Sequence, residues 1–185
     1  AGALVPNSRV VLKNVLLNPT RIEAYKVLEK MGAKIEFKET NNDFESVGEI
    51  HIESSKLRAV SVSENISWLI DEAPALAIAF ACAEGVSKLT NAKELRVKES
   101  DRIKAVVQNL QKCGIDAKEL DDGFEIVGGV PQRAQIQSFG DHRIAMSFAV
   151  LGLLCGIEID ECECINTSFP NFLSLLEKLG ANIEK

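Results

Sequence analysis

The sequence predicts an α/β or α+β fold. Short segments rich in β-branched residues alternate along the whole chain with longer amphipathic or apolar segments, and no linker or low-complexity stretch interrupts them. A weak repeat supports the same prediction, because a helix, a glycine and a short strand recur three times. The copies are VLEKMGAKIEF at 27–37, NLQKCGIDAKEL at 109–120 and LLEKLGANIEK at 175–185. We therefore expect one supersecondary unit that is used several times within a single domain.

The expected elements follow from periodicity and from turn residues. Strands are expected at 8–13, 48–53, 86–90, 124–127, 134–137 and 157–163. Helices are expected at about 20–31, 71–84, 101–113, 141–155 and 169–179. Asp122-Gly123 predicts a hairpin turn before the fourth strand, and the polar segment 38–47 predicts a surface hairpin. The alternation of Cys162 and Cys164 with glutamates is typical of a strand.

Each copy of the repeat ends its helix at a glycine. Gly32, Gly114 and Gly180 supply the left-handed turn, and a lysine in each last turn favours the negative end of the helix dipole. The glycines are 82 and 66 residues apart, which is too far for a solenoid repeat. The spacing fits a unit of several strands and two helices.

Composition excludes some classes of partner. The formal net charge of −6 and the 5% aromatic content argue against a broad nucleic-acid surface or binding to anionic membranes. The apolar stretches 73–83 and 144–156 are shorter than the ~20 residues that a membrane-spanning helix needs. The 5 cysteines contain no CxxC motif, so neither a metal site nor a disulfide framework is expected, and a cytoplasmic location is favoured.

Charged residues stand before the apolar helix expected at 71–84. Asp71 lies at its start, and Pro74 falls in its first turn, where proline is favoured. Acidic residues are common at helix starts because of the dipole, so Asp71 taken alone can be an N-cap.

The segment 94–106 (ELRVKESDRIKAV) gathers basic residues within an acidic protein. If a helix starts near Ser100, Arg102 lies in its first turn, where a cation is unfavourable with the helix dipole. A bound anion is the simplest compensation. The alternative is a solvated charged face with internal ion pairs.

The segment 139–154 (FGDHRIAMSFAVLGLL) opens another apolar helix with charged residues. Asp141 can cap this helix, and His142 and Arg143 are then its first residues. If the repeated units pack with their helices parallel, the three helix starts converge. The result would be a site with two arginines, a lysine and at least two carboxylates, which suits an anionic substrate that exchanges protons.

These motifs resemble those of the EPSP synthase family. The resemblance rests on IDE at 70–72, VKESDR at 97–102, GDHR at 140–143 and SFPNFLSLLEKLGA at 168–181, and covers essentially the whole chain. It implies a two-domain enolpyruvyl transferase fold, an inside-out α/β barrel built from repeated βαβαββ units. It also implies transfer of the enolpyruvyl group of phosphoenolpyruvate to the 5-hydroxyl of shikimate 3-phosphate, with release of phosphate, in the shikimate pathway to chorismate and aromatic amino acids. No cofactor is implied.

The resemblance also implies residue roles. Asp71 corresponds to the carboxylate that contacts the shikimate hydroxyls and accepts a proton, and Glu99 to a carboxylate that transfers a proton to the methylene carbon. Lys98 corresponds to a lysine near shikimate 3-phosphate. Arg102 and Arg143 correspond to the arginines that clamp phosphoenolpyruvate, a role suited to bidentate guanidinium geometry.

Three further positions belong to the implied substrate site. His142 precedes the second clamping arginine and is expected to orient groups around it. Glu94 stands where some family members have Asn. Thr167 stands where some members have a lysine that helps to bind phosphoenolpyruvate, and a threonine cannot supply that charge.

The resemblance implies that residues 1–185 are the C-terminal domain of a larger protein whose N-terminal domain is absent, so we expect this fragment to be inactive alone and the full-length protein to be a monomer. Two other functions stay open. One is a UDP-N-acetylglucosamine enolpyruvyl transferase, which shares fold and chemistry, and the other is a non-catalytic structural domain.

Overall fold

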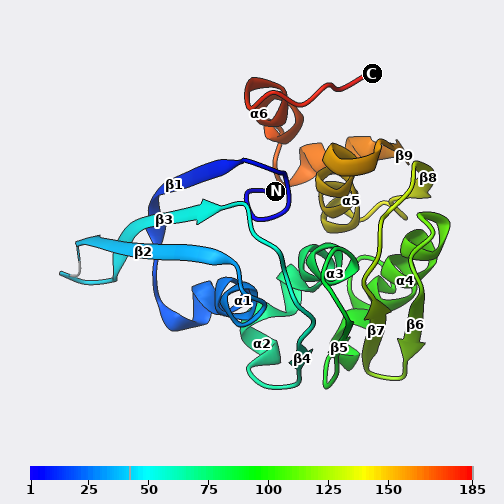
Figure 1. The fold of residues 1–185 in the computed structure, drawn as a ribbon, viewed down its shortest axis with the longest axis horizontal. Coiled ribbons are helices and arrows are strands. Elements are labelled where there is room, and N and C mark those ends of the chain that lie inside the picture. The colour runs from blue at the N-terminus through cyan, green and yellow to red at the C-terminus, as the bar shows by residue number, and fades with distance from the viewer. Residues whose placement is uncertain (42, 185) are drawn as a thin grey trace.

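The structure is a computed structural model and describes residues 1–41 and 43–184. It confirms the mixed α/β class. Within the described residues the strands form three separate sheets, which lie around the outside of the molecule, with helix α3 near its centre (Figure 1). The three sheets correspond to successive copies of the repeated unit.

The first unit is an antiparallel sheet in the order β1-β3-β2, with a helix between its first two strands. Its elements are β1 (Arg9–Leu16), α1 (Pro19–Lys30), β2 (Lys34–Asn41) and β3 (Val47–Glu53). The hairpin expected at 38–47 is confirmed, although β2 continues to Asn41 and residue 42 lies outside the described residues.

The second unit has the strand order β4-β5-β7-β6, in which only β4 and β5 are parallel. Its elements are β4 (Ser61–Val62), α2 (Ile66–Leu69), the 3₁₀ turn η1 (Ile70–Glu72), α3 (Ala73–Ala81), β5 (Val86–Leu89), the 3₁₀ helix η2 (Lys93–Val97), α4 (Arg102–Lys112), β6 (Ala117–Leu120) and β7 (Gly123–Val127).

The hairpin between β6 and β7 is confirmed, but Gly123 has a different role from the one expected. Leu120 pairs with Gly123, so Gly123 is the first residue of β7 rather than part of the turn. A Cβ atom at Gly123 would lie 1.9 Å from the carbonyl oxygen of Leu89. Glycine is therefore needed here for close approach of two backbones.

The third unit is a parallel pair of strands with a helix between them. Its elements are β8 (Ala134–Gln137), α5 (His142–Cys155), β9 (Ile157–Asp160), the 3₁₀ helix η3 (Cys162–Thr167) and α6 (Phe172–Lys178). The prediction of a strand over 157–163 is wrong beyond Asp160, because Glu161 adopts a left-handed conformation with φ of 56°. Cys162 and Cys164 consequently lie in a 3₁₀ helix.

The glycines of the repeat behave as predicted, with φ of 92° at Gly32, 75° at Gly114 and 101° at Gly180. A strand follows the first two glycines. The strand expected after the third is absent from 181–184, and residue 185 lies outside the described residues.

Helix α3 organises the core around the helix starts. It contacts α1, α4 and α5, and almost all of its residues are buried. Its many alanines allow these neighbours to approach closely, while Leu76, Ile78 and Phe80 fill the space between them. The chain leading into α3 therefore lies beside the starts of α4 and α5.

Candidate active site

The three helix starts meet at the carboxylate of Asp71. Its Oδ1 accepts a hydrogen bond from Nη1 of Arg102 at 3.2 Å, and its Oδ2 accepts one from Nη2 of Arg143 at 3.3 Å. Nη1 of Arg143 also donates to the backbone carbonyl of Asp71 at 3.0 Å. Residues far apart in the sequence thus form one cluster of opposite charges.

The interpretation of Asp71 as an N-cap is wrong. Asp71 lies within η1, which directly precedes α3, and Glu72 occupies the N-cap position of α3 without a capping hydrogen bond from its side chain. The side chain of Asp71 bridges two guanidinium groups instead.

Arg102 is the most enclosed member of the cluster. Its side chain is 1% exposed, and its Nε donates to Oδ2 of Asp141 at 2.8 Å while its Nη2 donates to Oε2 of Glu99 at 2.6 Å. With Asp71 it therefore has three carboxylate partners. Internal ion pairs therefore offset its charge at the start of α4, and the side chain is buried rather than part of a solvated face.

Asp141 links the cluster to α5. Its side chain is fully buried, and its Oδ1 accepts the backbone N–H of Arg143 at 2.9 Å, which confirms the predicted cap. Burial alone would raise the pKa of Asp141, but hydrogen bonds and charge attraction from Arg102, with the N–H of Arg143 and the hydroxyl of Ser100, hold that pKa below its usual value. Asp141 is thus a charged anchor for Arg102, a role that the sequence analysis missed.

Lys98 extends the cluster toward solvent. Its ammonium group pairs with the carboxylate of Glu94 and lies 3.9 Å from Oδ1 of Asp71. Its side chain is 22% exposed, whereas that of Glu94 is 62% exposed. Lys98 is therefore partly exposed beside Asp71, whose side chain is 44% exposed.

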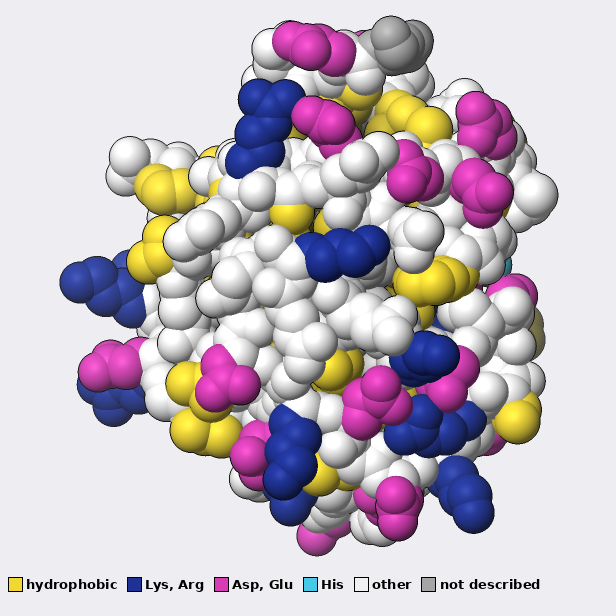
Figure 2. Space-filling model, turned by 90° about the vertical axis from the view of Figure 1, so that its right-hand side faces the viewer, with side chains coloured by type: hydrophobic (Ala, Val, Ile, Leu, Met, Phe, Trp, Pro, Cys, Tyr) yellow, Lys and Arg dark blue, Asp and Glu magenta, His cyan; other side chains and the backbone are white. Residues whose placement is uncertain are grey.

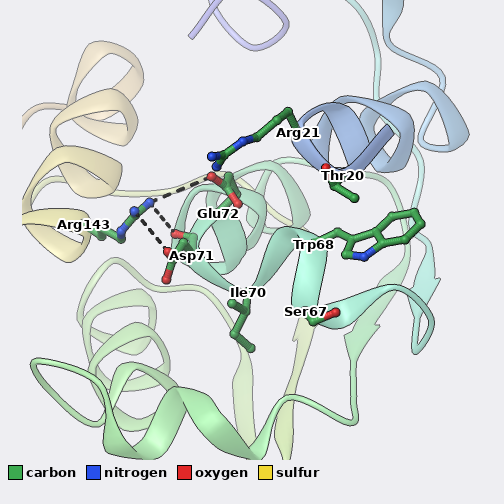
Figure 3. A pocket seen from close by; sticks show the side chains of 8 residues that line it. All are labelled: Thr20, Arg21, Ser67, Trp68, Ile70, Asp71, Glu72 and Arg143. Atoms are coloured by element: carbon green, nitrogen blue, oxygen red, sulfur yellow. Dashed lines mark hydrogen bonds and ion pairs between the residues drawn. The ribbon is translucent and has the colours of Figure 1, made fainter. Parts of the chain in front are cut away.

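A small cavity opens beside Arg143 (Figure 3). Arg143 and Glu72 lie on one side of it, and Arg21 reaches in from α1. Its lining residues are Thr20, Arg21, Ser67, Trp68, Ile70, Asp71, Glu72 and Arg143. At about 140 Å³ it is smaller than the ~300–1,000 Å³ of typical ligand pockets. The described residues therefore form one wall of a site rather than an enclosed pocket.

Two predicted site residues are not joined to this cluster by a recorded contact. His142 is half-buried as the first residue of α5. Thr167 is exposed at the end of η3, where its hydroxyl donates to the carbonyl of Cys164 at 2.7 Å. The structure thus brings together Asp71, Glu94, Lys98, Glu99, Arg102 and Arg143. His142 is next to Arg143 in the chain, and Thr167 lies in η3, which packs against α5.

The cluster combines guanidinium forks with carboxylates at hydrogen-bonding distance. Such a set can bind an anionic ligand and move protons at its edge.

Across the described residues, no group of three or more His, Cys, Asp or Glu side chains is arranged to hold a metal ion. No helix within 1–41 or 43–184 is both long and apolar enough to span a membrane. On the face in Figure 2, Lys and Arg are scattered among Asp and Glu and form no broad basic surface.

Comparison with known families gives a match over nearly the whole chain. The family model described as EPSP synthase (3-phosphoshikimate 1-carboxyvinyltransferase) matches residues 1–176. The 3-phosphoshikimate 1-carboxyvinyltransferase of Campylobacter jejuni strain 81-176 is 66% identical over 185 residues, which are 100% of this chain and 43% of that protein. The enzyme of the same name from Campylobacter concisus is 62% identical over the same span.

Solved structures agree with this match. The EPSP synthase of Acinetobacter baumannii superposes with a TM-score of 0.94 at 40% identity, over 99% of this chain and 44% of the other. The enolpyruvyl transferase NikO of Streptomyces tendae superposes with a TM-score of 0.75 at 16% identity, over 99% and 41% of the two chains, and supports the fold alone. This chain therefore spans less than half the length of these proteins.

Proposed function

Because this chain belongs to the EPSP synthase family, we propose that the protein containing it transfers the enolpyruvyl group of phosphoenolpyruvate to the 5-hydroxyl of shikimate 3-phosphate. The observation that carries the proposal is the position of Asp71 between Arg102 and Arg143. The carboxylate of Asp71, which can act as an acid or a base, thus contacts two guanidinium groups that can bind an anion.

Under this proposal Arg102 and Arg143 bind phosphoenolpyruvate, and Lys98 binds shikimate 3-phosphate. Glu99 gives a proton to the methylene carbon while Asp71 takes the proton of the attacking hydroxyl. The tetrahedral intermediate then loses phosphate and a methyl proton to form the enol ether. Arg143 is the more open arginine, since its side chain is 33% exposed against 1% for Arg102.

The remaining predicted residues have supporting roles in the proposal. His142 orients groups beside Arg143, and Glu94 holds Lys98 through their ion pair. Thr167 stands where a lysine would add positive charge, so phosphoenolpyruvate depends more on the two arginines in this protein. We further infer a cytoplasmic location, supported by free thiols at all described cysteines. We infer no nucleic-acid partner, supported by the formal net charge of −6. We also take the full-length protein to be a monomer.

The direct test is an assay of the full-length protein. We expect it to release phosphate when both substrates are present and to form the enolpyruvyl ether of shikimate 3-phosphate, identified by mass spectrometry. UDP-N-acetylglucosamine as acceptor tests the sister activity and should give no product. The purified 185-residue chain should be inactive, because groups that position both substrates lie elsewhere. Lack of turnover by the full-length protein would reject the proposal.

We also propose that residues 1–185 form the C-terminal domain of a two-domain protein, and a comparison of the repeated units supports this. In each of the first two units an antiparallel strand lies between two others: β3 between β1 and β2, and β7 between β5 and β6. In the third unit, among the described residues, β9 pairs only with β8. In α6 of the same unit, large apolar side chains are exposed, 41% for Leu175 and 73% for Leu179. A strand from the rest of the longer protein would complete this unit.

Hydrogen exchange tests this domain proposal. The backbone amides of β9 should exchange faster in the 185-residue chain than in the full-length protein, because their outer edge gains a partner there. Strand β5, which has neighbours on both edges, is the matched control and should exchange equally in both. Equal exchange of β9 in the two proteins would contradict the proposal.

A further inference from the structure

Arg96 connects the candidate active site to the β6–β7 hairpin. Its Nη2 donates to the carbonyl of Leu120 at 2.7 Å, and its Nε donates to the carbonyl of Asp121 at 3.1 Å. Its Nη1 donates to Oδ2 of Asp101 at 2.8 Å and to Oε2 of Glu119 at 3.1 Å. The side chain is 26% exposed. Every nitrogen of this guanidinium thus has a partner.

The segment next to Arg96 carries active-site groups. Helix η2 ends at Val97 and α4 begins at Arg102, so only residues 98–101 join them. This joint contains Lys98 and Glu99. At its far end Asp101 caps α4 by accepting the backbone N–H of Lys104 at 3.0 Å. Because the same aspartate binds Arg96, the arginine fixes both ends of the joint.

The β6–β7 hairpin is anchored on the other side of η2 as well. The backbone N–H of Asn91 donates to Oδ2 of Asp122 at 2.7 Å, and that of Ala92 donates to the Asp122 carbonyl at 2.7 Å. These contacts hold the residues before η2, whereas Arg96 ties the hairpin, through Asp101, to the joint that follows η2. Loss of this link would loosen the joint at its η2 end, while Ser100 stays bonded to Asp141 and Glu99 to Arg102. It would leave η2 anchored at its start.

We propose that Arg96 is a positioning residue, which clamps the joint 98–101 to the β6–β7 hairpin so that Lys98 and Glu99 reach the substrates. The inference rests on the proposed function and deepens it. A guanidinium suits this role because its planar fork donates to two carbonyls and two carboxylates at once, which an ammonium group cannot do. Arg96 touches no substrate itself in this scheme and acts through Lys98 and Glu99.

Steady-state kinetics of the full-length protein test the clamp. Arg96→Ala should lower kcat about 10- to 100-fold, since small misplacements of catalytic groups have effects of this size. The KM for shikimate 3-phosphate should rise, whereas the KM for phosphoenolpyruvate should stay within about threefold, because Arg143 is held by contacts that do not involve Arg96. Mere loss of folded protein would lower the apparent kcat and leave both KM values unchanged.

Three variants serve as comparisons. Arg96→Lys should fail to restore kcat, because it cannot reproduce the fork. Glu119→Gln removes one carboxylate but leaves the carbonyl contacts and should stay within about twofold of the unmodified protein. Arg9→Ala removes an exposed arginine paired with Glu53 at 3.8 Å and should leave kcat unchanged. Equal losses in Arg96→Ala and Glu119→Gln would overturn the assignment of the clamp to the carbonyls.

Hydrogen exchange of the 185-residue chain gives a readout that is independent of activity. Arg96→Ala should speed exchange at 97–101 and leave β5 unchanged. If the unmodified full-length protein turns over and Arg96→Ala matches it in kcat and both KM values, the inference fails while the proposed function stands. If the unmodified protein has no activity, the proposed function fails, and unchanged exchange at 97–101 would reject the clamp separately.

Discussion

Replacing Arg102 by alanine is expected to lower the free energy of unfolding of the 185-residue chain by about 3–5 kcal/mol, the usual cost of leaving a buried charge without its partner. The physical reason is Asp141, whose side chain is 0% exposed and whose Oδ2 would lose its guanidinium donor. Urea denaturation at neutral pH, with the midpoint and slope compared between variants, measures the change.

Arg143→Ala is the matched control for this loss. Arg143 also opens a helix and also binds Asp71, but its side chain is 33% exposed, so water can solvate the groups that it leaves. Its removal should change the free energy of unfolding by about 1 kcal/mol or less. Equal losses of unfolding free energy in the two variants would contradict the assignment of a structural role to Arg102 in addition to its role in ligand binding.

Asp71→Asn in the full-length protein is expected to lower kcat about 10²- to 10⁴-fold, the usual contribution of a positioned acid or base. The amide keeps the shape of the side chain and one oxygen that can accept a hydrogen bond from an arginine, but it cannot take up the hydroxyl proton at neutral pH. Its folding should therefore change little. Initial rates at saturating concentrations of both substrates, together with a denaturation curve, separate the two effects.

A similar aspartate elsewhere provides the control. Asp160 accepts a hydrogen bond from Nε2 of Gln135 at 2.9 Å on the exposed end of β9. Asp160→Asn should leave kcat within about twofold of the unmodified protein. A kcat for Asp71→Asn that is also within a few-fold would exclude Asp71 as the proton acceptor.

Local sequence signals were enough to predict the features that depend only on residues close together in the sequence. The repeat glycines end their helices in the left-handed conformation, and Asp141 caps α5. The cation at the start of α4 was correctly recognised as needing compensation, although carboxylates of the protein supply it. Each of these features follows from dipoles or backbone sterics within one turn of a helix.

Contacts between distant segments could not be predicted in the same way. The ion pair between Arg102 and Asp141 joins residues 39 positions apart, and no periodic pattern marks it. Asp71 was ambiguous because an N-cap and a cross-helix ion pair use the same residue type at the same place. The strand expected through 163 failed because Glu161, a residue type that gives no turn signal, adopts a left-handed conformation.

The three carboxylates around Arg102 also bear on how an anion would enter this site. The guanidinium groups of Arg102 and Arg143 are already oriented by counter-ions that belong to the protein. An incoming carboxylate or phosphate would displace the carboxylate of Asp71 from the exposed side of Arg143, because that guanidinium group already has a counter-ion. Because the arginine rotamers are already fixed, little side-chain entropy would remain to be lost when the ligand binds. Before a ligand binds, the carboxylate of Asp71 thus occupies the position beside Arg143 that the ligand's negative charge would take.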